Sequence, residues 1–235
     1  MDIFRKIIPS VIIALGLGLV GWGIKAGFTS VAEKDRQVFV CGLAEREVKA
    51  DKVTWPIVYN LAGNDLPSLY DQIGKNNATV IKFLKDNGIT DAEISVDAPN
   101  VYDQQSNRYN SDKPLYRFNV TSVIVVTSKN VDKVDELIKR QAELMKDGVA
   151  LSTEDYNYQT LYEFTGLNDI KPEMIAEATQ NARQAAQKFA EDSESTLGKI
   201  QSATQGQFSI EDRDAYTPSI KSVRVVTSIT FSLED

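Results

Sequence analysis

The spacing of hydrophobic residues changes several times along the chain, and each change predicts a structural element. An uncharged stretch runs from Ile7 to Ile24. Apolar positions then alternate over 38–48 and again over 53–61, and this period of two predicts two strands. Over 65–88 they recur at steps of three and four residues, which predicts an amphipathic helix.

Strand and helix patterns continue to the C-terminus. We expect strands over 92–103, 114–128 and 150–164, helices over 130–148 and 171–198, and closing strands over 199–212 and 219–235. Start and stop residues support the helix bounds: Asp65 and Asn130 as N-caps, Pro67 and Pro172 in first turns, Gly88 and Gly148 at the ends.

The order of the expected elements is ββ-α-ββ-α-β-α-ββ, behind the uncharged N-terminal stretch. Strands that follow each other without a helix pair antiparallel, because a parallel pair needs a long crossover. The sequence therefore predicts an α+β fold, with an N-terminal transmembrane helix followed by antiparallel sheets and packed helices.

The uncharged stretch contains a match to G-x-G-x-x-G at Gly16, Gly18 and Gly21. A dinucleotide site needs a strand before such glycines, and here they lie inside the apolar run itself. As a helix, the run from 7 to 24 would span roughly 27 Å, close to the hydrocarbon thickness of a bilayer. We therefore predict a transmembrane signal-anchor helix over 7–28 that binds the lipid bilayer.

Basic residues set the orientation of this anchor. Arg5 and Lys6 precede it, which favours a cytoplasmic N-terminus over 1–6. A linker over 29–36 then leads to an outer domain over 37–235. The alternative is cleavage near Ala32, but the apolar run is longer than that of a signal peptide and Lys25 stands before the cut, so retention is favoured.

Small residues in the predicted anchor have the spacing of packed membrane helices. Ala14 and Gly18 stand four residues apart, as do Gly23 and Gly27. This spacing lets two helix backbones approach closely. Glycine is also common in membrane helices for no specific reason, so both interpretations stay open.

The last expected helix is rich in alanine on one face. Ala178, Ala182, Ala186 and Phe189 recur at helical spacing. We expect these residues to form the packing face of the helix against a sheet or another helix.

Composition narrows the available chemistry. The chain has 235 residues, a net charge of −7, no histidine and one cysteine. The acidic balance argues against nucleic-acid binding. The lack of histidine removes His-based triads and His-ligated zinc. We therefore expect no catalytic residue, no metal ligand and no cofactor.

Two sets of reactive side chains precede the second strand. Cys41 could be a nucleophile, but a small buried thiol is the favoured interpretation, because no histidine is present to activate it. Glu45, Glu47 and Asp51 could bind a cation or act as acids and bases. A solvated turn region explains this acidic group better than a site does.

The tip of the central hairpin also carries polar residues. Asp103, Gln105 and Asn107 alternate as ligands do in a calcium loop. Arg108 stands where that loop requires glycine, so we interpret the segment as a polar hairpin tip.

Four segments of the chain together follow the pattern of a known family. They are "VFVCGLAEREVKADKVTWPI", "LKDNGITDAEISV", "YRFNVTSVIVVTS" and "AEATQNARQAAQKFAEDSESTLGKI". The matching positions are Gly42, Lys85, Gly88, Ile89, Ile94, Ala178, Ala182, Arg183, Ala186 and Ala190. With these segments the chain resembles the SIMPL-domain family of bacterial envelope proteins. The resemblance implies an α+β fold that builds ring-like oligomers, and it implies no established reaction.

Together these features predict a membrane-anchored bacterial envelope protein that acts by homo-oligomeric assembly or partner binding, without catalysis. We place it in the inner membrane, with the outer domain in the periplasm. The aromatic segment at Tyr156, Tyr158 and Thr160 is a candidate contact, unless it covers the protein's own helices. The alternatives are a stress-related or regulatory periplasmic factor that binds another protein, and an unrecognised carboxylate-dependent enzyme.

Overall fold

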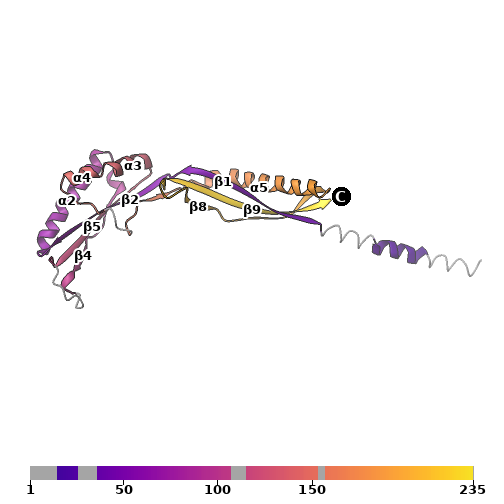
Figure 1. The fold of residues 1–235 in the computed structure, drawn as a ribbon, viewed down its shortest axis with the longest axis horizontal. Helices are drawn as coiled ribbons and strands as arrows, with labels where there is room; N and C mark the ends of the chain where they lie inside the picture. Colours follow the sequence, from indigo (N-terminus) through magenta and orange to yellow (C-terminus); the bar gives the residue numbers. More distant parts are fainter. Residues whose placement is uncertain (1–14, 26–35, 107–114, 153–156, 235) are drawn as a thin grey trace, which may run out of the picture. The chain divides into compact units, whose positions relative to one another are not determined.

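The structure is a computed structural model that describes residues 15–25, 36–106, 115–152 and 157–234 (Figure 1). The chain divides into two compact units. Unit 1 comprises Met1–Arg46, Ile170–Ser209 and Val223–Asp235, and unit 2 comprises Glu47–Asp169 and Ile210–Ser222. Antiparallel sheets with packed helices confirm the predicted α+β class.

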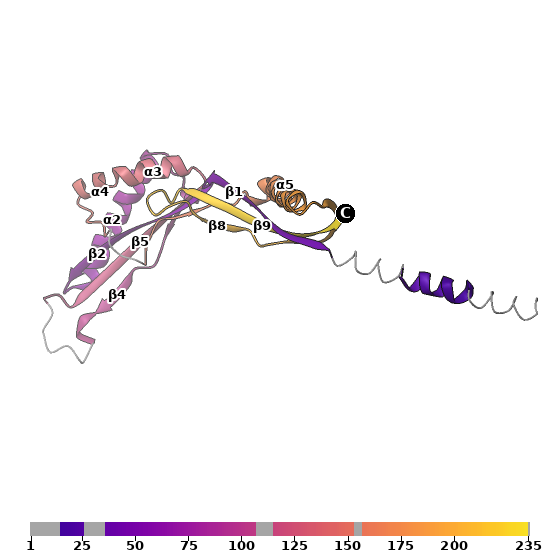
Figure 2. The same cartoon turned by 45° about the vertical axis from the view of Figure 1, so that its right-hand side comes forward.

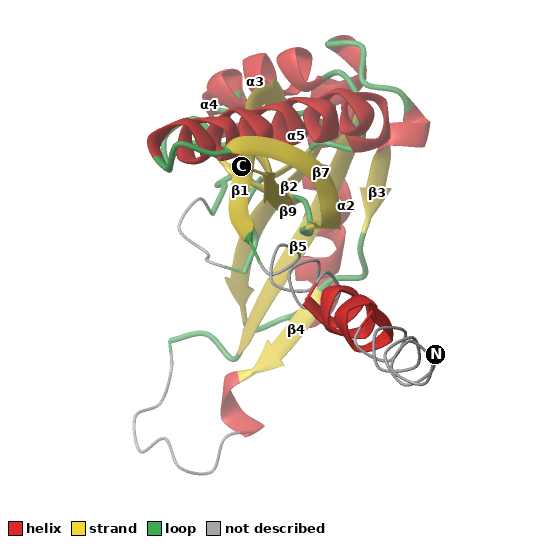
Figure 3. Cartoon of the chain, turned by 90° about the vertical axis from the view of Figure 1, so that its right-hand side faces the viewer, coloured by secondary structure: helices red, strands yellow, loops and turns green. Residues whose placement is uncertain are grey.

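Unit 1 is built on a sheet with the strand order β1-β9-β7. The strands are β1 (Gln37–Lys49), β9 (Ile220–Glu234) and β7 (Thr196–Gln205), and β8 (Ser209–Asp212) also pairs with β9. The partition assigns residues of β1 and β9 to both units. Helix α5 (Leu167–Asp192) lies along one face of this sheet (Figure 3).

Unit 2 is built on a five-stranded sheet with the order β3-β5-β2-β6, in which β4 also pairs with β5. Its central pair runs from Val53 opposite Ser128 to Gly63 opposite Phe118. The strands are β2 (Lys52–Gly63), β3 (Ile94–Val96), β4 (Asn100–Asp103), β5 (Phe118–Ser128) and β6 (Leu161–Glu163), with short 3-10 turns η1 (Asp91–Glu93) and η2 (Gln104–Ser106).

Three helices form the core of unit 2 with the central strands. They are α2 (Leu66–Asp86), α3 (Val131–Arg140) and α4 (Ala142–Lys146), seen beside β2 and β5 in Figure 2. Leu84, Val134 and Leu144 come from these three helices and are fully buried. They share one apolar cluster with Trp55 and Ile124 of the sheet.

The helix boundaries follow the predicted caps closely. Asp65 accepts a hydrogen bond from the backbone N–H of Ser68, and Asn130 accepts one from Lys133. Gly88 and Gly148 have φ values of 78° and 90°, in the left-handed region that glycine adopts without strain. Local side-chain chemistry therefore fixes these helix ends.

Three expected elements are each divided in two, and one of them is the strand expected over 199–212, which becomes β7 and β8. The strand expected over 92–103 becomes β3 and β4, because Pro99 between them has no N–H for a ladder hydrogen bond. The helix expected over 130–148 becomes α3 and α4. At Gln141 the backbone N–H bonds to the carbonyl of Ile138, three residues back, so the helix tightens there.

The strand expected over 150–164 is wrong for most of its length. Leu151 forms an isolated bridge to Tyr59, and only Leu161–Glu163 form β6, with Leu161 opposite Thr54. Between these two pairing points the segment advances by ten residues while β2 advances by five. The segment therefore cannot pair with β2 in one continuous register. Tyr158 and Thr160 lie outside any strand, and Tyr156 lies outside the described residues.

Helix α5 begins and ends earlier than expected. It starts at Leu167, so Pro172 is its sixth residue and not part of its first turn. Its end is marked by Glu194, whose φ is 55°, while the N–H of Ser195 bonds to the carbonyl of Ala190. Gly198, the last residue of the expected helix, lies within β7.

The predicted anchor falls partly within the described residues, which form a helix over 15–25. Its large apolar side chains are exposed, with Trp22 at 72%. Among the described residues, no helix has both the length and the apolar character needed to cross a membrane. Residues 1–14 and 26–35, on either side of this helix, lie outside the described part of the chain.

Candidate functional site

The two faces of β1 in unit 1 have opposite environments. Val40, Gly42 and Ala44 point toward α5 and are buried. Phe39 and Leu43 point the other way, with exposed fractions of 67% and 39%. Because both sets are apolar or small, β1 presents hydrophobic side chains to solvent as well as to the core.

Close packing of α5 on β1 depends on Gly42. A Cβ atom built at this glycine would lie 1.9 Å from the carbonyl oxygen of Ala178 and 2.8 Å from the Cβ of Ala182. Such distances are far inside van der Waals contact, so only glycine fits at this position. The helix therefore approaches the strand backbone directly.

Four alanines of α5 form the packed side of the helix. Ala178, Ala182 and Ala186 are fully buried, and Ala190 follows at the same spacing. Ala182 and Ala186 share an apolar cluster with Val40 and Phe231 of the sheet. Asn181 adds a hydrogen bond of 2.8 Å from its side-chain amide to the carbonyl of Leu43.

Phe189 does not belong to this packed side, because 58% of it is exposed. The buried alanines follow a four-residue row, and each step of four residues turns by about 40° around the helix. Viewed down the helix axis, Ala190 lies about 120° around from Ala178. Phe189 lies only about 20° around from Ala178, on the side where the row begins. The seam has therefore moved away from Phe189 near the end of α5.

The side of the sheet opposite α5 is called the open face below. It is defined by Phe39, Cys41 and Leu43 of β1, Ser228 and Thr230 of β9, and Thr204 of β7. The Sγ of Cys41 lies 3.5 Å from the Oγ of Ser228, and Thr204 stands opposite Ser228 in the β7–β9 ladder. None of these six side chains carries a charge.

Cys41 is exposed, so the expectation of a buried thiol is wrong. The cause is the two-residue period of the strand. Gly42 must face α5, and its neighbour Cys41 therefore points to the open face.

The acidic residues near the end of β1 are not brought together as one site. Glu47 pairs with Arg213 at 3.3 Å, and Asp51 accepts hydrogen bonds from the backbone N–H groups of Thr165 and Gly166. Glu45 is exposed on the same side of β1 as Glu47. Within the described residues, no group of three or more acidic or cysteine side chains is placed to hold a metal ion.

The polar hairpin tip is organised by an ion pair. Asp103 accepts hydrogen bonds of 2.8 and 3.1 Å from the guanidinium of Arg117, and these hydrogen bonds lower the pKa of Asp103. Gln105 donates its backbone N–H to the same carboxylate. Asn107 lies outside the described residues.

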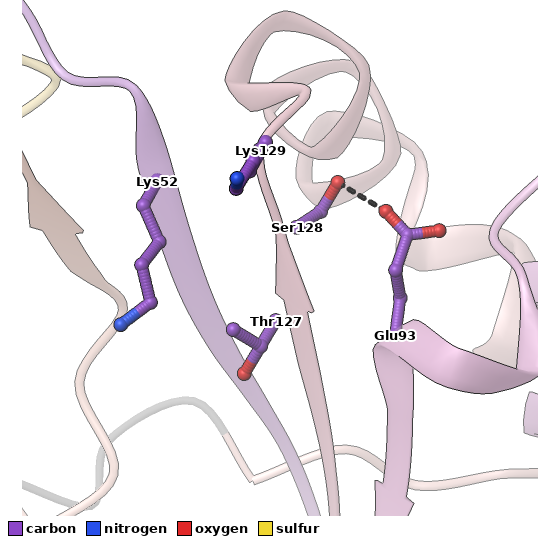
Figure 4. A pocket seen from close by; sticks show the side chains of 5 residues that line it. All are labelled: Lys52, Glu93, Thr127, Ser128 and Lys129. Atoms are coloured by element: carbon purple, nitrogen blue, oxygen red, sulfur yellow. Dashed lines mark hydrogen bonds between the residues drawn. The ribbon is translucent and has the colours of Figure 1, made fainter. Parts of the chain in front are cut away.

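Unit 2 has a depression of about 360 Å³ lined by Lys52, Glu93, Thr127, Ser128 and Lys129 (Figure 4). Ser128 donates its hydroxyl to Glu93, and Lys52 pairs with Glu163 at 2.7 Å. The carboxylate of Glu93 and the ammonium of Lys52 thus already have partners within the protein. Among the five lining residues, no nucleophile is paired with a free base.

A loop between β8 and β9 presents a single tyrosine. Tyr216 is 95% exposed. Asp214 holds the loop by accepting the backbone N–H groups of Tyr216 and Thr217, both at 2.8 Å. The hydroxyl of Thr217 and the guanidinium of Arg213 hold the pKa of Asp214 well below its usual range.

Two of the small residues of the predicted anchor, Gly18 and Gly23, fall within the described residues. A Cβ atom at Gly18 or Gly23 would meet nothing within 4 Å. Ala14 and Gly27 lie outside the described residues. Their role in membrane-helix packing therefore stays a prediction.

A family model covers most of the chain and both units. The model for SIMPL, a protein family of unknown function (DUF541), matches residues 38–231. The chain belongs to the SIMPL family. The match begins in β1 and ends in β9, so the SIMPL domain includes the open face, α5 and all of unit 2. No curated protein matches the chain.

The sequence contained a signal for the open face of the SIMPL domain. Phe39, Cys41 and Leu43 fill the positions between Val38, Val40 and Gly42, so this strand is apolar on both sides. Such a continuous apolar run is typical of a strand covered on both faces. In the structure α5 covers one of these faces.

Proposed function

We propose that this SIMPL protein is a membrane-anchored bacterial envelope protein that acts through homo-oligomeric assembly and not through catalysis. The observation that supports the assembly is the open face of unit 1. Phe39 and Leu43 are exposed there beside uncharged serine and threonine side chains. Contiguous apolar surface of this kind is typical of interaction sites.

Charge distribution adds to this proposal. A quarter of the residues are charged, and the net charge of −7 makes two copies repel each other in general. Copies of the chain therefore associate most easily through a surface that lacks charge. The six residues that define the open face carry no charge, and Glu45 of β1 and Arg224 of β9 bound them on the same side of the sheet.

The proposed anchor over 7–28 supports assembly in a second way. It would place the outer domain in the periplasm, tethered to the inner membrane. Tethering raises the effective concentration of neighbouring copies, so weak lateral contacts suffice. Exposed apolar side chains such as Leu17 and Trp22 in the helix over 15–25 are compatible with a lipid environment.

Light scattering coupled to size-exclusion chromatography tests the assembly. The full chain, purified in detergent, should elute as a defined oligomer after the detergent mass is subtracted. A chain that is strictly monomeric at about 100 µM would contradict the proposal. At that concentration only contacts with dissociation constants in the millimolar range would escape detection.

The exposed tyrosine loop favours a second candidate function, the binding of another protein. Tyr216 is held at the tip of an ordered loop, and tyrosine provides a large contact area at low entropic cost. A photo-crosslinking residue at position 216 should give one heterologous adduct in cells, while the same residue in place of the exposed Tyr70 should not. Equal labelling at both positions would remove this candidate.

A further inference from the structure

We infer that the depression of unit 2 binds the carboxylate of a small organic acid through the ammonium of Lys129 and the hydroxyl of Thr127. Both residues line the depression, and Figure 4 shows them at the end of β5. The inference adds a ligand site to the proposed function and does not depend on the assembly of the chain.

The alternation of side chains along β5 places these two groups on one side of the sheet. Ser128 is buried opposite Val53, which belongs to the apolar cluster that the helices share. Thr127 and Lys129, on either side of Ser128 in the chain, are exposed. Successive side chains point to opposite faces of a strand, so Thr127 and Lys129 project from the face opposite to Ser128.

Two of the other lining residues already have partners within unit 2. Ser128 donates its hydroxyl to Glu93 and accepts the backbone N–H of Asn130. Lys52 pairs with Glu163, which stands directly opposite on β6, at 2.7 Å. A ligand would have to compete with these contacts to bind Ser128 or Lys52.

The carboxylate of Glu93 is also fully used. It accepts hydrogen bonds from the hydroxyl of Ser128 and from the backbone N–H and hydroxyl of Thr90. These hydrogen bonds lower the pKa of Glu93, and the charged group that adds to them is Lys133. Lys129 is therefore not the counter-ion of Glu93.

The ammonium of Lys129 and the hydroxyl of Thr127 have no such partners. In the part of the chain that the structure describes, neither group makes a hydrogen bond or an ion pair. One step beyond the pairing of Val53 with Ser128, Lys52 and Lys129 stand opposite each other, and like charges so placed repel. Glu163 compensates Lys52, so Lys129 leaves one positive charge uncompensated beside the depression.

This charge balance favours a carboxylate over a more highly charged anion. A phosphate monoester carries a charge of about −1.5 to −2 at neutral pH. The carboxylates of Glu93 and Glu163 would repel its second charge. A carboxylate carries one charge, and its two oxygens can accept one hydrogen bond from Lys129 and one from Thr127.

The size of the depression limits the rest of the ligand. Its volume of about 360 Å³ lies near the lower end of the range of small-molecule sites, roughly 300–1,000 Å³. The aliphatic stem of Lys129 and the methyl group of Thr127 offer apolar contact to a short chain. The ligand is therefore a small acid with a neutral remainder, either free or as the C-terminal end of a peptide.

Nuclear magnetic resonance of the full chain in an uncharged detergent tests the inference. Reductive methylation with ¹³C labels each lysine and keeps its charge. Propionate, added at constant ionic strength, should shift the Lys129 signal with saturation in the millimolar range, as expected for one charge-assisted contact. The signal of Lys82, an exposed lysine of α2, should not saturate. Equal titration curves for the two lysines would show unspecific ion binding and overturn the inference.

Substitutions test the two groups, with propionate binding measured by saturation-transfer difference. Lys129→Gln should weaken binding roughly tenfold or more, and Thr127→Val, which keeps the shape of the side chain, roughly threefold or more. Lys129→Arg keeps the charge and should retain most of the affinity. Lys82→Gln is the matched control and should change nothing. Circular dichroism would verify that all four variants fold, and an unchanged affinity of Lys129→Gln would overturn the inference.

A last arm tests the chemical class and the source of the ligand. Propionamide, the neutral analogue of propionate, should not bind. N-acetyl-glycyl-alanine presents the carboxylate as the end of a peptide. Tighter binding of this peptide than of propionate would support a peptide C-terminus as the ligand, and weaker binding would support a free acid. Equal binding of propionate and propionamide would overturn the assignment of a carboxylate.

Discussion

Thr227 is a buried residue whose hydroxyl has no hydrogen-bond partner among the described residues. Only 4% of the residue is exposed. An unsatisfied buried polar group costs about 1–3 kcal/mol, so Thr227→Val should raise the free energy of unfolding by about 1 kcal/mol. Urea denaturation measures this change.

Thr227→Ser is the control for that substitution. It keeps the hydroxyl and removes a methyl group, so it should lower stability by about 1 kcal/mol. A loss of stability in both variants would show that the hydroxyl has a partner.

Glu93 is expected to make stability depend on pH. Its carboxylate accepts hydrogen bonds from the hydroxyl of Ser128 and from the backbone N–H and hydroxyl of Thr90. The Ser128 hydrogen bond is the largest cause of the lowered pKa of Glu93, followed by those from Thr90. Its stabilisation is therefore present above the unfolded value of about 4.3 and is lost as the pH falls below it.

Glu93→Gln tests this dependence. The variant should be less stable than the original chain at pH 7, and the difference should shrink between about pH 5 and pH 3. Urea midpoints at several pH values measure it. A difference that stays constant over this range would assign the effect to packing and not to charge.

Gly42 and Gly74 are expected to respond oppositely to the same substitution. Gly42→Ala places a methyl group against the α5 backbone and should cost about 3 kcal/mol or more. Gly74 lies inside α2 with nothing within 4 Å of its Cβ position, so Gly74→Ala should add about 0.5–1 kcal/mol. Thermal unfolding of the two variants compares them directly, and shifts of the same sign would contradict the close helix approach.

At the scale of elements, the buried row of α5 makes a further prediction. Ala186→Leu forces extra methylene groups into the seam against Val40 and should lower stability by about 1–3 kcal/mol. Lys188→Leu on the exposed side should change it by less than about 0.5 kcal/mol. Equal effects in denaturant titrations would contradict this assignment of faces.

The helix ends of unit 2 followed from local signals in the sequence, whereas the contacts between elements did not. Asp65, Asn130 and Gly88 act within a turn of their own positions, so the sequence was sufficient to locate those helix ends. The exposure of Phe189 could not be predicted, because it depends on how the row of buried alanines turns around α5. The sheet against which the helix packs determines that turn. The sequence did not show that α5 covers only one side of β1. The exposure of the open face could therefore not be predicted.

At the scale of the whole molecule, the N-terminal segment carries its own prediction. A retained anchor over 7–28 would keep the protein in the inner membrane through carbonate extraction, because apolar contact with lipid does not depend on charge. Cell fractionation followed by N-terminal sequencing should then find a chain that begins at or near Met1. A mature chain that begins at Glu33 would contradict the anchor.

The division of the chain into units has a consequence for biogenesis. The partition passes from one unit to the other after residues 46, 169, 209 and 222. During synthesis β1 therefore emerges early, while β9, the strand that completes its ladder, is among the last segments made. Until β9 has been made, the apolar strand β1 has no neighbouring strand to pair with, and such unpaired strands are prone to aggregation. We expect the nascent protein to depend on a holding chaperone for nearly the whole of its translation.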